Sequence, residues 1–448
     1  MVVSRDKAPT AQETFMQMAQ AAGLRGRLLV TIGLLILVRL GIHIPLPGID
    51  RVRFAQDIQN SPIIGFLDIF SGGGISAVGV FALGILPYIN ASIILQLLTA
   101  AIPYLENLQK NEGEAGRRRI SQITRYVTVV WAVVQSIGIS LWIQRYAAPG
   151  NGGLVFVAET VLALTAGSMF VMWLSELITE RGIGNGASLL IFINIVAVLP
   201  RSLGQTFELA QTGDREIVGR VIILLLVFLV MIVGIVFVQE GTRRIPIVSA
   251  RRQVGRRLYR ERTSYLPLRL NQGGVMPIIF ASAVLVLPAS LAQFTQTSDN
   301  NGLLFQVHQV LNQVANYLSP TGQTPWLYVA FYVVLIVFFS YFYASLIVNP
   351  VDMAQNLKKM GASIPGIRPG RTTSEYIERV LNRLTFLGAV FLGAVAIIPT
   401  AVESSIGVAT FKGLGATSLL ILVGVAIDTA KQIQTYVISQ RYEGMVKQ

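Results

Sequence analysis

The sequence predicts an all-α integral membrane protein with ten transmembrane helices, from its composition, its long apolar segments and the uneven distribution of its basic residues. Of 448 residues, 53% are hydrophobic and only 13% are charged, whereas a soluble domain carries about a quarter charged residues. A soluble protein of this length needs a charged surface that this chain lacks. The hydrophobic excess therefore indicates a membrane protein.

Ten segments are predicted to be transmembrane, since a helix needs about 20 mainly apolar residues to cross the hydrocarbon core. They lie at 25–43, 79–101, 122–142, 154–177, 187–206, 217–238, 273–294, 326–348, 381–400 and 415–436. The first segment runs into a Pro-rich stretch at 44–48 instead of a small-residue cleavage site. We therefore expect a retained span and not a cleaved signal peptide.

The basic residues predict the orientation of these spans. With the N-terminus in the cytoplasm, 28 of the 36 Lys and Arg residues fall on the cytoplasmic side, 7 fall outside, and Arg39 lies inside the first span. Basic residues favour the cytoplasmic side, so both termini are expected there. Two halves of five spans then enter the membrane in opposite directions, a pattern typical of a path between inverted repeats. The expected parts are a tail at 1–24, an N-terminal half at 25–206, a C-terminal half at 207–436 and a tail at 437–448.

The residue types argue against several kinds of chemistry. The chain has no cysteine and two histidines, so disulfides and thiolate sites are excluded, and a metal site built on several histidines is not expected. No phosphate-binding motif of the form G-x-x-x-x-G-K-[ST] occurs. We find no catalytic constellation, and we expect neither enzyme activity nor a cofactor nor a metal.

Ionisable groups inside the predicted spans are sparse, which bears on transport. Arg39 lies near the outer end of the first span, where its side chain is expected to reach the membrane surface. Glu176 and Asp428 lie toward the cytoplasmic ends of theirs. This weakens the alternative of a secondary transporter for a small solute, although a sodium site made of carbonyls would leave no such trace.

Some predicted spans are interrupted by proline and softly polar residues. The second contains Pro87 and Asn90, and the seventh contains Pro277 and Pro288. Such helices either face a cavity and shift, or are ordinary kinks packed inside a bundle. Between the first two spans, residues 66–76 are apolar, too short to cross, and include three consecutive glycines. This pattern fits a re-entrant segment buried in protein or an interfacial loop.

Six motifs, in chain order, resemble those of the SecY family in its bacterial and plastid form. They are Ile44–Asp50, Phe70–Gly73, Phe81–Ser92, Glu112–Arg118, Thr179–Gly186 and Gly366–Gly370. The similarity covers the chain from about Arg25 to Glu443. It implies ten helices in two pseudo-symmetric five-helix halves that form a clamshell around a central pore. The implied function is a protein-conducting channel that passes unfolded secretory polypeptides across the membrane and releases transmembrane segments sideways into lipid.

The resemblance implies three sets of channel residues. The pore ring falls on Ile85, Ile89, Ala187, Ile191, Ile279 and Ile421, where Ala187 is smaller than the expected residue. The plug falls within about 66–76 and includes Phe66, Leu67, Asp68, Ile69, Phe70, Ser71, Gly72 and Gly73. The lateral gate includes Asn90, Ser92, Gln135 and Leu287. Without the motifs, the isoleucines would be interpreted as bundle packing and the polar residues as interhelical hydrogen bonding.

The resemblance also implies partners. Two cytoplasmic loops, at about 239–270 and 349–380, carry the expected contacts to a SecA ATPase or to ribosomal RNA phosphates. These residues are Arg251, Arg256, Arg257, Lys358, Lys359 and Arg368. For most of the nine arginines of the first loop, the cytoplasmic bias of basic residues is an equal explanation. Further partners are the small membrane subunits SecE and SecG, signal peptides, nascent chains and the lipid bilayer.

The expected location is a bacterial plasma membrane or a thylakoid membrane. A structural or insertase-type scaffold, which helps helices fold without a pore through it, stays open as another alternative.

Overall fold

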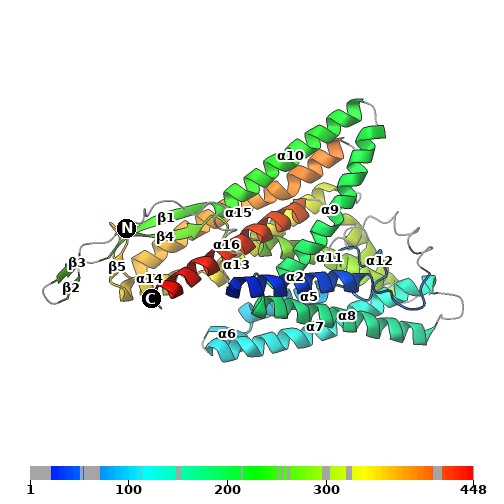
Figure 1. The fold of residues 1–448 in the computed structure, drawn as a ribbon, viewed down its shortest axis with the longest axis horizontal. Coiled ribbons are helices and arrows are strands. Elements are labelled where there is room, and N and C mark those ends of the chain that lie inside the picture. Colours follow the sequence, from blue (N-terminus) through cyan, green and yellow to red (C-terminus); the bar gives the residue numbers. More distant parts are fainter. Residues whose placement is uncertain are drawn as a thin grey trace. The chain divides into compact units, whose positions relative to one another are not determined.

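The computed structural model describes residues 22–50, 54, 71–110, 112–147, 153–212, 215–249, 252–254, 257–259, 263–294, 303–318, 325–406 and 416–446. Most of them are helical (Figure 1). The helices are α2 (Ala22–Ile42), α5 (Leu86–Ala101), α6 (Pro103–Lys110), α7 (Gly113–Ile143), the 3-10 turn η1 (Gln144–Tyr146), α8 (Leu154–Arg181), α9 (Gly186–Thr212), α10 (Arg215–Glu240), α11 (Met276–Phe294), α12 (Leu303–Tyr317), α13 (Pro325–Ile347), α14 (Pro350–Lys359), α15 (Arg371–Ile406) and α16 (Ala416–Val446).

Each of the ten predicted spans overlaps one of these helices. By length and composition alone, five helices among the described residues can cross a membrane, or six if α5 and α6, which meet at a 104° bend, count as one span. The surface of α10 supports a lipid environment, because Ile222, Leu229 and Phe237 are more than half exposed. A continuous apolar face of this kind is expected against lipid tails.

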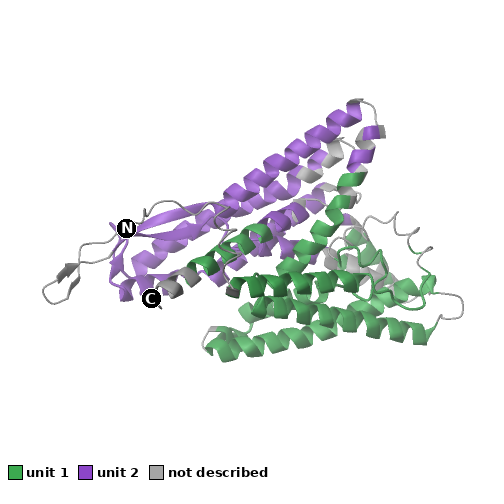
Figure 2. Ribbon diagram, in the orientation of Figure 1, with its two compact units in different colours: residues 1–205, 286–315, 425–448 green, residues 206–285, 316–424 purple. Residues whose placement is uncertain are grey.

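The chain forms two compact units, which Figure 2 distinguishes by colour. Unit 1 comprises Met1–Gln205, Val286–Ala315 and Val425–Gln448, and unit 2 comprises Thr206–Leu285 and Asn316–Gly424. The predicted division into halves at 206/207 and their pseudo-symmetry stay predictions.

In unit 1, α7 packs against α8, α5 and α6, and α8 packs against α2. Close approach depends on glycine: a Cβ at Gly167 of α8 would lie 2.2 Å from the Val80 carbonyl oxygen. Small residues at such contacts let backbones come together in a membrane bundle. One apolar cluster of this unit gathers around the fully buried Phe54, whose ring packs edge-on against Trp142 and Tyr146 at 5.4 and 5.2 Å.

In unit 2, α15 packs against α13, α10 and α14. Between α10 and α11 the chain forms an antiparallel pair, β1 (Thr242–Ser249) with β4 (Thr263–Arg269), and β1 also pairs with β5 (Ala362–Ser363). A separate short hairpin joins β2 (Arg252–Val254) to β3 (Arg257–Tyr259). Ile245, Leu268 and Ile377 lie in the apolar cluster that holds the β1–β4 pair to α14 and α15.

The predicted helical membrane class is confirmed, and the structure adds one detail to it, because the loop predicted at 239–270 is largely a β-hairpin. It also shortens the second span: the predicted segment begins at 79, but α5 begins at Leu86. Residues 72–85 instead form turns, with backbone hydrogen bonds to residues 44 and 46. Gly72, Gly73 and Gly84 adopt positive φ there, a conformation that favours glycine.

Candidate functional site

Two residues of the predicted pore ring, Ile85 and Ile89, lie at the start of α5. Ile85 precedes the helix, and the Ile89 amide donates to its carbonyl at 3.1 Å. Both side chains are buried, at 1% and 6% exposure. Ser168 Oγ of α8 donates to the Gly84 carbonyl at 3.2 Å, and Pro87 suits a first helical turn because it needs no acceptor for an N–H. The start of α5, and with it the direction of the two isoleucines, is therefore fixed.

Two further ring residues, Ala187 and Ile191, lie in the first turns of α9. The turn that precedes this helix is held from two sides: the Ile183 amide donates to Thr31 Oγ1 of α2 at 3.0 Å, and the Gly186 amide donates to Thr179 Oγ1 of α8 at 2.9 Å. A Cβ at Gly186 would lie 1.9 Å from a backbone oxygen of α8, so only glycine fits. Ile191 is 1% exposed and the smaller Ala187 is partly exposed.

The last two ring residues belong to unit 2. Ile279 on α11 and Ile421 on α16 are 3% and 0% exposed. Val275, one turn before Ile279, lies so close to Gly424 of α16 that a Cβ on that glycine would be 2.2 Å from its Cγ2. The residue that precedes α11 therefore lies against α16 three residues after Ile421. Since the other four members belong to unit 1, a closed ring of six stays a prediction.

The predicted lateral-gate residues Asn90 and Ser92 lie on α5, and Gln135 lies on α7, which packs against it. Asn90 is 8% exposed and Gln135 is 7% exposed. Ser92 Oγ accepts a hydrogen bond from Gln96 Nε2 at 3.1 Å. Leu287 falls on α11, but its side chain lies outside the described part of the chain.

Two buried polar atoms on α7 lack partners within the described residues. They are Gln135 Oε1, an acceptor, and Trp131 Nε1, a donor, and they lie one helical turn apart on the same face. Sequence reasoning singled out Gln135 and missed Trp131. A buried polar atom without a partner is costly, so this face is suited to a group that supplies one.

The predicted plug lies only partly within the described residues, since Phe66, Leu67, Asp68, Ile69 and Phe70 fall outside them. Ser71 is fully buried, and its Oγ accepts from the Ile75 amide at 3.2 Å. Gly72 and Gly73 have φ of +68° and +89°. Both glycines thus adopt a positive φ, a backbone conformation that other residues rarely take.

Sequence reasoning missed the partner of Arg39, which was expected to reach the membrane surface. Its Nη1 donates to the Gly72 carbonyl at 2.8 Å. The two residues are 33 positions apart, so no local pattern links them. The available signal was an arginine inside an apolar span, which needs a partner wherever it is buried.

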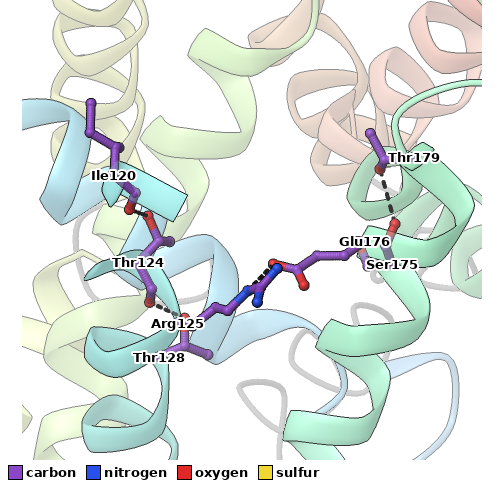
Figure 3. Close-up of polar contacts among 7 residues, drawn as sticks. All are labelled: Ile120, Thr124, Arg125, Thr128, Ser175, Glu176 and Thr179. Carbon is purple, nitrogen blue, oxygen red and sulfur yellow. Dashed lines mark hydrogen bonds and ion pairs between the residues drawn. The ribbon is translucent and has the colours of Figure 1, made fainter. Parts of the chain in front are cut away.

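A polar connection between α7 and α8 was also missed (Figure 3). Arg125 Nε donates to Glu176 Oε1 at 2.9 Å, with the glutamate side chain only 16% exposed. Along the same helices, Thr124, Thr128 and Thr179 donate to carbonyls four residues earlier, at 2.7 to 2.9 Å. Glu176 is therefore committed to an ion pair between helices.

The predicted partner-binding residues are described only in part. Arg251 and Arg256 fall outside the described residues, and Arg257 lies on β3 with an undescribed side chain. Lys358 and Lys359 are exposed at the end of α14.

Arg368 is exposed, and its surroundings fix its backbone. Its carbonyl accepts from Thr373 Oγ1 at 2.8 Å, and Gly366 and Gly370 on either side have positive φ. These features hold the backbone of the turn in place, and the direction of the Arg368 side chain stays a prediction.

Comparison with solved structures defines the fold. The chain is similar to a structure titled "The structure of a protein conducting channel", with a TM-score of 0.63, 17% identity and coverage of 97% of this chain and 95% of that one. A structure of Sec61 in a canine ribosome–channel complex matches with a TM-score of 0.61, 16% identity and the same coverage. The chain therefore has the mostly helical, multi-pass membrane fold of these structures.

Sequence relatives define the family. The family model described as SecY matches residues 79–430. The "Protein translocase subunit SecY" of Synechococcus elongatus is 73% identical over the full length of both chains, and that of Porphyra purpurea is 56% identical over 96% of this chain and all of the relative. The chain belongs to the SecY family, in its cyanobacterial and plastid form. It is the protein-conducting channel subunit of a Sec translocase, an integral membrane protein and not an enzyme.

Proposed function

We propose that this channel passes unfolded polypeptide through an apolar collar formed by Ile85, Ile89, Ala187, Ile191, Ile279 and Ile421. The observation that carries the proposal is the fixed start of α5 and α9, which holds Ile85, Ile89 and Ile191 in buried, defined directions. Apolar side chains conform around a passing chain without binding it, and a narrow apolar constriction excludes water and ions. The secondary-transporter alternative gains no support, since Glu176 is engaged by Arg125.

The collar is tested by Ile191→Asn, with ion conductance of the purified channel complex in planar bilayers as the measurement. A polar group at the constriction wets it, so resting conductance is expected to rise several-fold. Leu190→Asn is the matched control, because Leu190 is the neighbouring residue, equally buried at 1%, and points about 100° away around the helix. Equal conductance in the two variants would remove Ile191 from the collar.

A plug at about 66–76 is proposed to seal this collar at rest and to move when a substrate enters. The positive φ of Gly72 and Gly73 supports a special backbone conformation at its C-terminal end. A related structure is titled "The plug domain of the SecY protein stablizes the closed state of the translocation channel and maintains a membrane seal". Deletion of residues 66–70 should leave partial transport and a leakier resting channel; a tight seal in that deletion would favour the interfacial-loop alternative.

Sideways release of transmembrane segments is proposed at a gate that includes Asn90, Ser92, Gln135 and Leu287. The unpaired Gln135 Oε1 supports a polar patch there, because polar groups at a seam open to lipid set how apolar a segment must be to leave. The chain has no native cysteine, so Asn90→Cys with Leu287→Cys can be crosslinked without a background. Transport should stop on oxidation and recover on reduction, with each single variant as control. Continued transport in the crosslinked form would contradict the gate.

Partner contacts are proposed for the basic residues of the two loops, with SecA, ribosomal RNA phosphates, SecE and SecG as partners. Arg368 is the strongest candidate because its turn is fixed. Arg368→Glu should weaken SecA or ribosome binding and slow translocation. Arg371→Glu is the control, because it makes the same charge change at a side chain that is 92% exposed and already paired with Glu375. Equal losses in both variants would indicate a general charge effect only.

The location proposed is a plasma or thylakoid membrane, from cyanobacterial and plastid relatives. Fractionation of the two membranes, followed by detection of the chain, tests it, and recovery in neither fraction would refute it.

A further inference from the structure

Gly72 lies at a junction of three segments of unit 1. Its carbonyl accepts the hydrogen bond from Arg39 Nη1 of α2 at 2.8 Å, and the side chain of Asn194 of α9 lies against it. A Cβ built on Gly72 would come within 2.5 Å of Asn194 Oδ1 and 2.6 Å of Arg39 Nη1. With φ at +68°, this position suits glycine in conformation as well as in space.

The charge of Arg39 makes this junction strong. No ion pair with Arg39 is found among the described residues. Within them, the charged guanidinium of Arg39 has the Gly72 carbonyl as its hydrogen-bond partner. A hydrogen bond from a charged donor is about twice as strong as one between neutral groups, and more so where water is scarce.

Asn194 connects this junction to the proposed pore ring. It is 3% exposed and lies three residues after Ile191, so the two side chains share a face of α9. Gly72 therefore lies against the face of α9 that also carries Ile191, a residue of the proposed collar.

The described backbone before the plug is held by different forces. Phe54 is fully buried against Trp142 and Tyr146, and the Asp50 amide donates to the Tyr146 carbonyl at 2.9 Å. This anchor is apolar and involves many atoms. The anchor at Gly72 is one charge-assisted hydrogen bond and one close contact, which makes it the easier of the two to release.

We infer that Arg39 and Asn194 form a clasp on Gly72 that holds Ser71–Gly74 in the conformation of the sealed channel. Arg39 is a positioning residue in this arrangement, because it acts through the backbone of Gly72. The inference rests on the proposed plug.

Two substitutions test the clasp in the purified channel complex, with resting conductance in planar bilayers as the measurement. Arg39→Met removes the charge and the donors but keeps an apolar stem, and loss of a charged hydrogen bond is expected to raise the open fraction about 10-fold. Arg39→Lys keeps the charge and should restore part of the seal. Gly72→Ala should raise conductance as well, because the methyl group displaces Arg39 or Asn194.

Gly113→Ala is the matched control for Gly72→Ala. Gly113 also has a positive φ, +57°, but a Cβ there meets nothing within 4 Å. Both variants therefore carry the same kind of backbone strain, and only Gly72→Ala disturbs the clasp. The double variant with Arg39→Met should leak no more than the stronger single variant, since both act on one junction. Thermal unfolding of each variant separates a leak from a loss of folded protein.

A deletion of residues 66–70, measured alongside, separates the two proposals. If the deletion leaks and a folded Arg39→Met channel stays as tight as the parent, the clasp is wrong and the plug stands. If the deletion itself stays sealed, the plug proposal fails and the clasp fails with it. Leak in both, with a tight Gly113→Ala channel, supports the clasp.

Discussion

Two of the non-helical regions that the structure describes are held together in opposite ways. In unit 2, β1 and β4 pair residue by residue from Thr242 with Arg269 to Val248 with Thr263. In unit 1, residues 72–85 form no ladder. Their backbone bonds are local, as from the Gly79 amide to the Gly74 carbonyl at 3.0 Å, or reach the Pro-rich stretch, as from the Val80 amide to the Ile44 carbonyl at 2.9 Å.

The difference lies in what each region depends on. A ladder satisfies its own backbone groups, so the hairpin needs its side chains mainly to attach it to α14 and α15. In the glycine-rich segment of residues 72–85, some backbone groups find hydrogen-bond partners in the Pro-rich stretch because the two segments approach very closely. This approach leaves no room for a Cβ at Gly79. The hairpin is therefore sensitive to the removal of apolar atoms, and the glycine-rich segment is sensitive to the addition of one methyl group.

The largest effect is expected for Gly79→Ala. Its Cβ would lie 2.1 Å from the Ile42 carbonyl oxygen, and a backbone atom cannot move aside as a flexible side chain can. We expect a loss of about 3 kcal/mol or more in the free energy of unfolding, at the upper end of overpacking effects. Thermal unfolding in detergent, followed by gel filtration, measures it.

Gly33→Ala is the control, since a Cβ at Gly33 on α2 meets nothing within 4 Å. This variant should be as stable as the parent or more stable, by up to about 1 kcal/mol from helix propensity. A Gly79→Ala protein with the stability of the parent would show that the segment can spread apart, which would remove the contrast with the hairpin.

The two regions also show where sequence reasoning succeeds and where it fails. The ten spans were predictable because hydrophobic length is a local signal, and each predicted span does overlap a helix. The hairpin was interpreted as a cytoplasmic loop because it lies between two predicted spans and carries nine arginines. Its alternation was present in the sequence, since the buried Ile245 and Ile247 alternate with the exposed Arg244 and Pro246.

The site divides in the same way. The turn around Arg368 was predictable from adjacent glycine and proline, because these residues act on their own backbone. The partners of Arg39 and Arg125 were not, because they lie 33 and 51 positions away and depend on tertiary packing. A motif in the sequence predicts which residues lie on a helix. It does not predict which distant residues hold that helix in place.

A smaller effect, confined to the hairpin, is expected for Ile245→Ala. Ile245 is 2% exposed and belongs to the apolar cluster between the hairpin and α14 and α15, so its truncation should cost about 2 to 4 kcal/mol of local stability. Because α15 also packs against α13 and α10, the helices should stay folded. Limited trypsin digestion should cut faster at the arginines of 243–269, with little change elsewhere.

Tyr265→Ala is the matched variant, because Tyr265 lies on the partner strand and is 58% exposed. It should resist trypsin nearly as well as the parent. If Ile245→Ala instead unfolds the whole protein, then the hairpin is not an independent attachment and the comparison fails on that side.

The smallest effect is expected at two helix starts, one in each unit. Asn349 caps α14, where its side chain accepts from the Val351 amide at 3.0 Å, and Asn185 caps α9, where Oδ1 accepts from the Ser188 amide at 3.2 Å. Replacing such a cap by alanine costs about 1 kcal/mol, or about a 5-fold faster local opening.

The two caps should differ because the start of α9 has a second acceptor, Thr179 Oγ1, which receives the Gly186 amide at 2.9 Å, and because Gly186 lies against the backbone of α8. Asn349→Ala should therefore accelerate amide exchange in α14 by about the full 5-fold, and Asn185→Ala should accelerate exchange in α9 by less. Hydrogen exchange measured by mass spectrometry compares the two peptides in one sample. An equal acceleration would mean that close backbone packing adds nothing to a cap. The rigidity of the start of α9, where two residues of the proposed collar lie, would then depend on Asn185 alone.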